Sequence, residues 1–241
     1  MPMNPRLLRP LATGFDPRRI AGISAWYDAT VASSVTLTSG FVSQWSDLSG
    51  AGHHMTQTTE ADRPGTGTIG GKAAIDFDGT SDYLSNAAAP SGWSSGTIFC
   101  VHERDGGANQ NLYGIVSGAH SMYASINSTA GEYRTGAGNS GSLGRSGSPA
   151  AAGTPRVLTH TSDNSTAGLR ISGTAAAGTT TGFLSNVAGT YLGVRNSASL
   201  GLGLFWNGKI GEFIVYSRVL SDAEIVRVER YLAAKWGVTL A

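Results

Sequence analysis

The stretch from Trp206 to Trp236, WNGKIGEFIVYSRVLSDAEIVRVERYLAAKW, decides the fold. Its first half is rich in β-branched and aromatic residues, which predicts a strand over Ile210–Tyr216. Alternation along that strand gives two faces, one with Phe213 and Val215 and the other with Ile210, Ile214 and Tyr216. Both faces are largely apolar, so a covering layer is expected on each side of this strand.

A turn and a helix are predicted on either side of the strand. Asn207-Gly208 favours a tight hairpin turn before it, because this pair readily adopts positive φ angles. After it, Ser221 and Glu224 have the spacing of a helix capping box. Behind the cap, apolar residues recur at helical spacing up to Gly237, a suitable helix end; they are Ile225, Val228 and Leu232. The sequence therefore predicts an amphipathic helix that folds back onto the sheet.

The composition favours a single all-β domain and excludes several kinds of partner. The chain has 241 residues, 34 of them Gly, and only 14% are charged, which is typical of short strands joined by tight turns. A net charge of +1 gives no electrostatic reason to expect nucleic acid or an anionic membrane as partners. Cys100 is alone, so an internal disulfide and a Cys-based metal site are both excluded.

Further short strands are expected along the rest of the chain. They are predicted at Ile20–Asp28, Phe41–Asp47, Lys72–Leu84, Thr97–Glu103, Leu112–Ser117, Ser121–Ile126, Val157–Ser162, Gly168–Ile171 and Tyr191–Val194. Clusters of Gly, Ser, Thr and Ala, densest from Thr135 to Gly153 and from Gly173 to Gly182, predict surface loops. No linker divides residues 20–241, so they are expected to form one domain.

Residues 1–19 contain four prolines and four arginines, a density that blocks both a helix and a central strand. A disordered tail is one interpretation. The other is an extended arm that attaches to a neighbouring subunit, with anchors at Arg6, Leu7, Leu8, Arg9 and Leu11. If residues 1–19 are such an arm, deleting residues 2–17 should leave the domain folded and abolish its attachment.

Several segments carry a family resemblance. They are Ile20–Asp28, Gln44–Gly50, Ala74–Gly79, Asp82–Leu84, Leu169–Thr174, Tyr191–Gly193 and Gly208–Glu224. Together they resemble the LamG-like, concanavalin A-like lectin/glucanase jelly rolls, especially the phage-encoded members. The resemblance implies an all-β jelly-roll sandwich of two antiparallel sheets with one short C-terminal helix. It leaves function open, because this fold carries lectins, hydrolases and structural modules.

A catalytic site is not expected. A retaining glucanase of this superfamily would carry a strand motif E-x-D-x-x-E, which places its carboxylates on one face. The nearest match begins at Glu103 and Asp105, but Ala108 stands where the last carboxylate belongs. The adjacent His53 and His54 would point apart on a strand and have no evident third metal ligand. No catalytic residue is therefore predicted.

Two groups of residues are candidates for binding. Asp47, Asp76 and Asp78, with Asp82 nearby, offer oxygen ligands for calcium, although Asp before Gly is also an ordinary turn former. No other cofactor is predicted. Tyr113, Tyr123, Tyr133 and Arg134 are the candidate glycan surface, because aromatic rings pack against sugars and Arg donates to hydroxyls. Alternating aromatic residues in strands are also common in protein cores.

The leading functional hypothesis is a non-enzymatic phage virion protein, on the capsid or the tail, displayed on the virion surface. The arm would bind other virion proteins or further copies of the chain. The alternative is a carbohydrate-binding adhesin that recognises host glycans, and a glycan hydrolase is a third possibility that the broken carboxylate motif disfavours.

Overall fold

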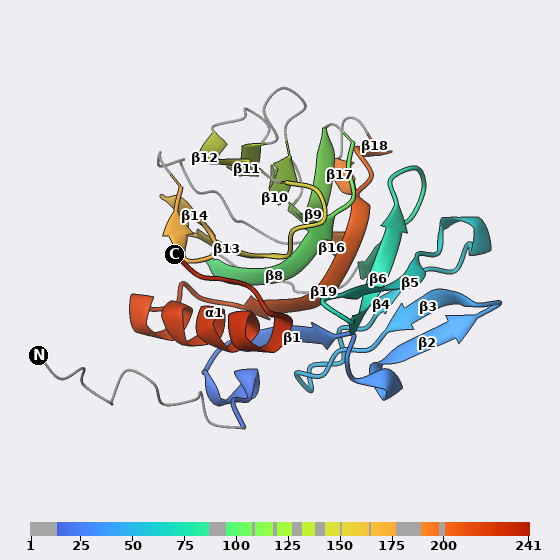
Figure 1. Ribbon diagram of the computed structural model, residues 1–241, viewed down its shortest axis with the longest axis horizontal. Helices are drawn as coiled ribbons and strands as arrows, with labels where there is room; N and C mark the ends of the chain where they lie inside the picture. Colours follow the sequence, from blue (N-terminus) through green and yellow to red (C-terminus); the bar gives the residue numbers. More distant parts are fainter. Residues whose placement is uncertain are drawn as a thin grey trace, which may run out of the picture.

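The computed structural model describes residues 14–86, 95–107, 109–117, 120–126, 132–137, 143–149, 151–163, 165–176, 189–197 and 201–241. Two antiparallel sheets pack face to face, and a single α-helix among these residues, α1 (Asp222–Trp236), covers the outer side of one of them (Figure 1). The predicted two-sheet sandwich with a C-terminal helix is thereby confirmed.

The sheet under α1 has eight strands in the described residues. In order they are β15 (Thr174–Ala175), β14 (Ala167–Ile171), β13 (Arg156–Ser162), β8 (Gly96–Arg104), β19 (Asn207–Tyr216), β6 (Lys72–Asp78) and β5 (Gly65–Ile69), with β1 (Ile23–Asp28) also paired to β19. The central strand β19 pairs with β8 on one side, and with β6 and then β1 on the other.

The second sheet has nine strands in the described residues. In order they are β12 (Leu143–Pro149), β11 (Glu132–Ala137), β10 (His120–Ile126), β9 (Gln110–Ser117), β16 (Gly189–Leu192), β7 (Leu84–Asn86), β4 (Met55–Thr56), β3 (Phe41–Trp45) and β2 (Val35–Thr38). A separate hairpin joins β17 (Arg195–Ser197) to β18 (Gly201–Gly203), and the short 3-10 helices are η2 (Pro17–Arg19), η3 (Ala32–Ser34) and η4 (Glu60–Asp62). Strands β11 and β12 occupy part of the region predicted to be loop, because backbone pairing outweighs the low strand propensity of Gly and Ser there.

The start of β19 differs from the prediction in two ways. Asn207 and Gly208 are not a hairpin turn but paired strand residues, opposite Asp78 and Phe77. Gly208 is needed because a Cβ at this position would overlap the carbonyl oxygen of Glu103. A register shift between Ile210 and Glu212 then turns Ile210 to the inner face, where it packs with Phe213 and Val215.

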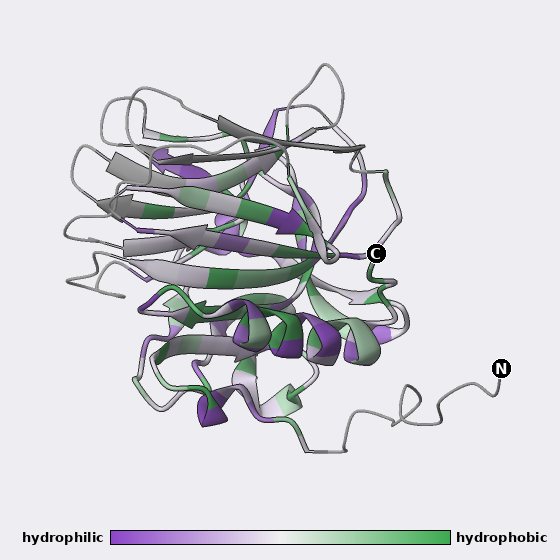
Figure 2. Cartoon of the chain, turned by 90° about the vertical axis from the view of Figure 1, so that its left-hand side faces the viewer, coloured by the Kyte–Doolittle hydropathy of each residue, from purple (hydrophilic) through white to green (hydrophobic). Residues whose placement is uncertain are grey.

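The helix forms as predicted. Ser221 and Glu224 form the capping box, and Gly237 follows the last turn in the left-handed conformation with φ 71°. The apolar side of α1 is buried against β8, β13 and β19 through Ile225, Val228 and Leu232. Figure 2 shows α1 lying along this sheet with hydrophobic and hydrophilic residues alternating around it.

A buried carboxylate fixes α1 to the sheet. Glu212 of β19 is fully buried and accepts hydrogen bonds from Trp26 Nε1 at 2.9 Å, Trp236 Nε1 at 2.9 Å and the Tyr231 hydroxyl at 2.9 Å. Lys235 Nζ lies 2.7 Å from Glu212 and also contacts Asp28. Burial raises the pKa of Glu212, and the charge of Lys235 opposes that rise. This cluster was not predicted from the sequence.

The N-terminal boundary of the domain lies earlier than predicted. The ring of Phe15 is 4.9 Å from that of Tyr231, and the Arg227 guanidinium lies over the Phe15 ring, 5.1 Å from its centroid. Pro17 is buried, and its carbonyl accepts a hydrogen bond of 3.0 Å from the Tyr216 hydroxyl. Residues 15–19 therefore belong to the packed domain and not to a detached arm. The predicted anchors Arg6, Leu7, Leu8, Arg9 and Leu11 lie outside the described residues.

Removing α1 should prevent folding. A chain of residues 1–220 loses the burial of Ile225, Val228 and Leu232, worth about 1.5–3 kcal/mol each, against a typical total stability of about 5–15 kcal/mol. It also leaves Glu212 buried without its partners on α1. We expect an insoluble product, with full-length Arg230→Ala, on the exposed side of the helix, as a soluble control. A soluble 1–220 chain that melts cooperatively would contradict this expectation.

The N-terminal boundary can be tested by two deletions. Deletion of residues 2–13 spares the contacts of Phe15 and Pro17 given above and should leave the melting temperature unchanged. Deletion of residues 2–17 removes those contacts and should lower the melting temperature by at least about 2 °C, the shift that some 0.5–1 kcal/mol produces in a chain of this length. The melting temperatures are measured by circular dichroism. Equal values for the two deletions would place the start of the domain at residue 20, as the sequence predicted.

Candidate functional site

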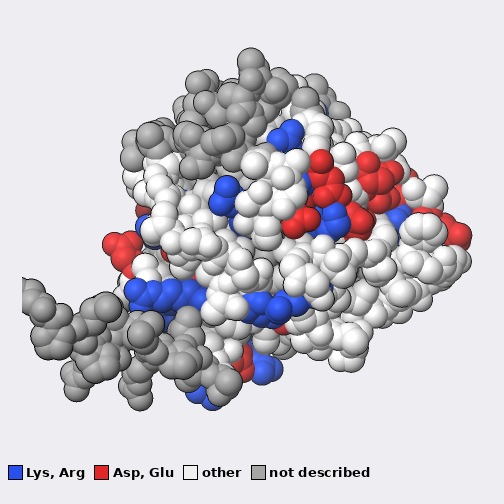
Figure 3. All heavy atoms as spheres, viewed as in Figure 1, with Lys and Arg blue, Asp and Glu red and all other residues white. Residues whose placement is uncertain are grey.

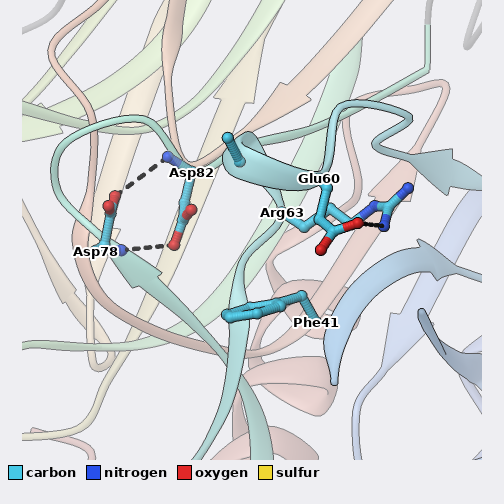
Figure 4. Close-up of a pocket in the computed structure, with 6 residues that line it drawn as sticks. Phe41, Glu60, Arg63, Asp78 and Asp82 are labelled. Atoms are coloured by element: carbon cyan, nitrogen blue, oxygen red, sulfur yellow. Dashed lines mark hydrogen bonds and ion pairs between the residues drawn. The ribbon is translucent and has the colours of Figure 1, made fainter. Parts of the chain in front are cut away.

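A pocket of about 530 Å³ lies between three segments that are distant in the sequence. Phe41 from the start of β3 forms one wall, Glu60, Ala61 and Arg63 from η4 and its end form another, and Asp78 and Asp82 from the β6–β7 loop form the third (Figure 4). A second pocket, of about 230 Å³, is lined mainly by Ala, Val, Leu and Ile side chains and holds no charged residue.

The β6–β7 loop is fixed by its own two aspartates. Asp78 Oδ1 accepts hydrogen bonds from the backbone N–H groups of Thr80, Ser81 and Asp82, at 2.7, 3.0 and 3.2 Å. Asp82 Oδ2 in turn accepts the backbone N–H of Asp78 at 3.0 Å. Each carboxylate uses only one oxygen in these bonds. The two acids are therefore held rigidly beside each other at the pocket wall.

The η4 wall is hydrogen-bonded both to this loop and to the β3 wall. The Ser81 hydroxyl donates to the carbonyl of Ala61 at 3.2 Å, and the N–H of Tyr83 donates to the carbonyl of Asp62 at 3.1 Å. The N–H of Val42 donates to the carbonyl of Pro64 at 2.8 Å, which joins β3 to the end of η4. These bonds preform the pocket.

The two loop aspartates differ in proton affinity. Burial raises the pKa of Asp82 to about 6; the Asp78 N–H opposes the rise, and the charges of Asp78, Asp76 and Asp62 add to it. Burial alone would raise the pKa of Asp78 as well, but the three backbone N–H groups that it accepts outweigh burial and lower it. At neutral pH both loop carboxylates are thus ionised, although burial and the neighbouring acids disfavour the charge of Asp82.

Arg63 is the cation among the lining residues, and two of its three guanidinium nitrogens already donate to backbone carbonyls. Its Nε donates to the carbonyl of Gln57 at 3.0 Å, and its Nη2 donates to that of Thr58 at 2.9 Å. Nη1 is buried with no hydrogen-bond partner in the described part of the chain and lies 3.9 Å from Glu60 Oε2. Nη1 is therefore the guanidinium nitrogen of Arg63 that has no described hydrogen-bond acceptor.

Phe41 leaves 46% of its surface exposed beside these polar groups. An exposed ring next to hydrogen-bond acceptors and a donor can contact a molecule that has both C–H faces and hydroxyl groups. Phe41, Glu60 and Arg63 were not identified from the sequence, and Asp82 was considered only for calcium. The available signal was an aromatic residue opening a strand, followed by charged residues before the Arg63-Pro64-Gly65 break.

The predicted glycan surface is wrong for two of its four residues. Tyr113 and Tyr133 are buried between the sheets, where their hydroxyl groups pair at 2.8 Å with His160 Nδ1 and His102 Nε2. Alternation along β9 and β11 turns both rings inward. Tyr123 is half-buried, and the side chain of Arg134 lies outside what the structure describes.

The predicted calcium ligands are not brought together. Both oxygens of Asp47 are used by its own turn and by β1: they accept from the N–H groups of Ser49, His53 and Trp26 and from the Ser49 hydroxyl. Asp78 is grouped with Asp82 instead, and Asp76 lies opposite Lys209 in the strand pairing. Within the described residues, no group of three or more His, Cys, Asp or Glu side chains is placed to hold a metal ion.

The incomplete carboxylate motif is part of an ion-pair cluster. Lys209 Nζ lies 2.6 Å from Asp105 and 3.9 Å from Glu103. Figure 3 shows acidic side chains gathered on the side of β5 and β6, whereas basic side chains run along α1. Among the described helices, none has the length and apolar character needed to cross a membrane.

Comparison with known proteins identifies the fold but no family. No family model and no curated protein matches the chain. Trypanosoma rangeli sialidase in complex with sialic acid is similar, with a TM-score of 0.63 at 12% identity over 87% of this chain and 33% of that one. The chain thus spans about a third of the length of the sialidase.

Two shorter structures match over nearly their whole length. Domain 4 of AbnA, a GH43 extracellular arabinanase from Geobacillus stearothermophilus, in complex with arabinotriose, has a TM-score of 0.61 at 15% identity over 86% of this chain and 98% of that one. The CBM40 of Ruminococcus gnavus IT-sialidase, bound to alpha2,3 sialyllactose, has a TM-score of 0.54 at 19% identity over 65% and 95%. These similarities establish the concanavalin A-like jelly-roll fold that the sequence predicted.

The pKa of Asp82 leads to a stability prediction. The folded state binds this proton more tightly than the unfolded state, whose Asp pKa is near 3.8, so ionised Asp82 destabilises the fold above pH 6. Asp82→Asn keeps the acceptor for the Asp78 N–H and removes the charge. The melting temperature should rise by about 2–4 °C at pH 7.5, the effect of about 1 kcal/mol in a chain of this length, and the gain should vanish near pH 4.

Asp163→Asn is the matched contrast for that variant. Hydrogen bonds from Thr166 and Ser165 lower the pKa of Asp163 to about 2, so its charge stabilises the fold at neutral pH. Its replacement should lower the melting temperature at pH 7.5 and have less effect near pH 2. If Asp82→Asn instead lowered the melting temperature at pH 7.5, as Asp163→Asn should, the ionised carboxylate of Asp82 would not be destabilising the fold.

Proposed function

We propose that this protein is a non-catalytic carbohydrate-binding domain whose ligand binds in the pocket between Phe41, Arg63 and the β6–β7 loop. The observation that carries the proposal is the combination of groups in one preformed pocket of about 530 Å³. A half-exposed aromatic ring lies beside two rigid carboxylates and a guanidinium with an unused N–H direction. Ligand pockets characteristically place a few fixed polar groups around apolar surface.

Each group has a defined role toward a sugar. The exposed face of Phe41 packs against the C–H face of a pyranose or furanose ring. The oxygens of Asp78 and Asp82 that the loop bonds do not use accept hydrogen bonds from sugar hydroxyls. Arg63 Nη1 donates to a hydroxyl or ring oxygen, which also supplies the partner that this buried N–H lacks.

The structural similarities support the proposal at the level of the fold. The similar domains of the arabinanase and of the Ruminococcus gnavus protein have sugars bound in their structures. The binding domain of Paraclostridial Mosquitocidal Protein 1 is also similar, with a TM-score of 0.61 at 13% identity. These proteins do not identify the sugar bound by this chain, because identity below 20% carries only the fold.

We also propose that the pocket has no hydrolytic activity. Asp78 and Asp82 each use an oxygen to hold the loop in place, so neither is free to move toward a glycosidic bond. Glu103 and Asp105 are paired with Lys209 at the end of β8, away from the usual arrangement of two facing carboxylates. Binding without turnover is the behaviour expected from these restraints.

Display on a phage particle stays a prediction from the family resemblance. The proposed attachment anchors lie outside the described residues, and the described ones give it no support. A sugar-binding domain displayed on a virion surface would act as the adhesin considered above, so the two hypotheses are compatible. The pocket proposal does not depend on that location.

The proposal predicts that Phe41→Ala abolishes most of the binding. After a glycan array identifies a ligand, titration calorimetry should show at least about tenfold weaker binding for Phe41→Ala, as is typical of an aromatic contact at the centre of a site. Leu202→Ala is the control, because Leu202 is exposed to a similar extent, 42%, and does not line the pocket. The same ligand should release no reducing ends. Unchanged affinity in Phe41→Ala would place the site elsewhere, and turnover lost in Asp82→Asn would make the protein an enzyme.

A further inference from the structure

The charges around the pocket are unbalanced. Its lining carries three carboxylates, on Glu60, Asp78 and Asp82, and one guanidinium, on Arg63. Asp62 and Asp76 lie near enough to act on Asp82 as well. With all of these groups ionised, the lining alone has a net charge of −2, from three negative groups and one positive group. The pocket is therefore acidic on a chain whose total net charge is +1.

The one lining cation does not offset this charge for a ligand. Two of the three nitrogen atoms of the Arg63 guanidinium are bonded to the carbonyls of Gln57 and Thr58. The third faces Glu60 at 3.9 Å. An anionic sugar would have to displace this pairing and would also approach the carboxylates of Asp78 and Asp82. Like charges at such distances disfavour binding.

Of the charged groups in the lining, the Asp82 carboxylate would be stabilised most by a bound cation. It is 7% exposed, its loop oxygen receives one backbone N–H, and the described neighbours that act on its charge are acids. Arg63 lies on a different wall from Asp82, where it faces Glu60 (Figure 4). A ligand ammonium next to Asp82 and Asp78 would form charge-assisted hydrogen bonds with these carboxylates and would be the cation that Asp82 lacks among its described neighbours.

We propose that the pocket is specific for cationic glycans, that is, for sugars with a free amino group such as glucosamine units. The ammonium would lie between the carboxylates of Asp78 and Asp82, and the C–H face of the same sugar would pack on Phe41. This inference rests on the proposed function and assigns it a substrate class. It sets this pocket apart from a site for sialic acid, whose carboxylate is negative.

The test compares three sugars of similar size on the full chain by titration calorimetry at pH 6.5 and low salt. They are a glucosamine trimer, the corresponding N-acetylglucosamine trimer and sialyllactose. We expect the glucosamine trimer to bind roughly tenfold more tightly than its N-acetylated form, and sialyllactose to bind most weakly. The preference should shrink as salt is raised, because the charges are partly exposed to solvent.

Two variants with the same change of net charge test whether the preference for the glucosamine trimer arises in the pocket. Asp82→Asn should reduce the ratio of the two affinities to about one. Asp222→Asn, at the exposed start of α1 and outside the pocket, should leave the ratio unchanged. The preference should also weaken below pH 6, where Asp82 takes up a proton, and at high pH, where the sugar amine loses its own.

The outcomes separate the inference from the proposed function. Equal binding of the amino and N-acetylated trimers, with Phe41→Ala weakening both, would overturn the inference and keep the carbohydrate-binding function. Tighter binding of a lysine-containing peptide than of the glucosamine trimer would overturn it in favour of a protein partner. Binding of none of these sugars, and of none on a glycan array, would overturn the proposed function itself.

Discussion

The buried carboxylate of Glu212 is the interaction on which the relation between sheet and helix depends. An ionised carboxylate in a protein interior is strongly destabilising unless it is paired and fully hydrogen-bonded. Here the donors come from two elements, Trp26 on β1 and Tyr231, Lys235 and Trp236 on α1. Any sliding or rotation of α1 would leave Glu212 with unused acceptors. Apolar burial holds the helix against the sheet, and Glu212 sets its position.

The same strand links this cluster to the pocket. β19 carries Glu212 in its middle and Asn207 at its start, where Asn207 pairs with Asp78 at the end of β6. Gly79, with φ 76°, turns the chain directly against Asn207, and a Cβ at Gly79 would overlap the Asn207 side chain. The position of β19 therefore fixes where the β6–β7 loop begins, and the hydrogen bonds of Asp78 and Asp82 fix the rest. The pocket wall is therefore held in place through the pairing of β19 with β6.

The sequence predicted the elements that depend on local rules and missed those that depend on distant contacts. The capping box at Ser221 and the apolar side of α1 involve residues close in the chain, and both form. The bulge at Gly211 exists where the indole of Trp236, 25 residues later, occupies the space of a side chain. Nothing near Gly211 indicates that contact, so simple alternation misplaced Ile210.

The pocket was missed for the same reason. Its walls come from residues near 41, 60 and 80, and no spacing rule relates them. The aromatic residues Tyr113 and Tyr133 have the composition of a sugar surface, but the pairing register turns them inward. Composition showed which residue types were present, and only the tertiary pairing showed which of them face solvent.

Buried ionisable groups in the core differ from Asp82 in the pocket in their charge and in their partners. Inside the sandwich, His102 and His160 are fully buried, and burial lowers their pKa values to about 4 and about 3. They remain neutral and pair with the hydroxyls of Tyr133 and Tyr113. At Glu212, where a charge is buried, a lysine is supplied for it. Asp82 is mostly buried at the pocket wall but has acids around it and no cation bonded to it among the described residues. The buried histidines are neutral and the buried Glu212 has a lysine, whereas Asp82 carries its charge beside an open pocket, where a cationic ligand can pair with it.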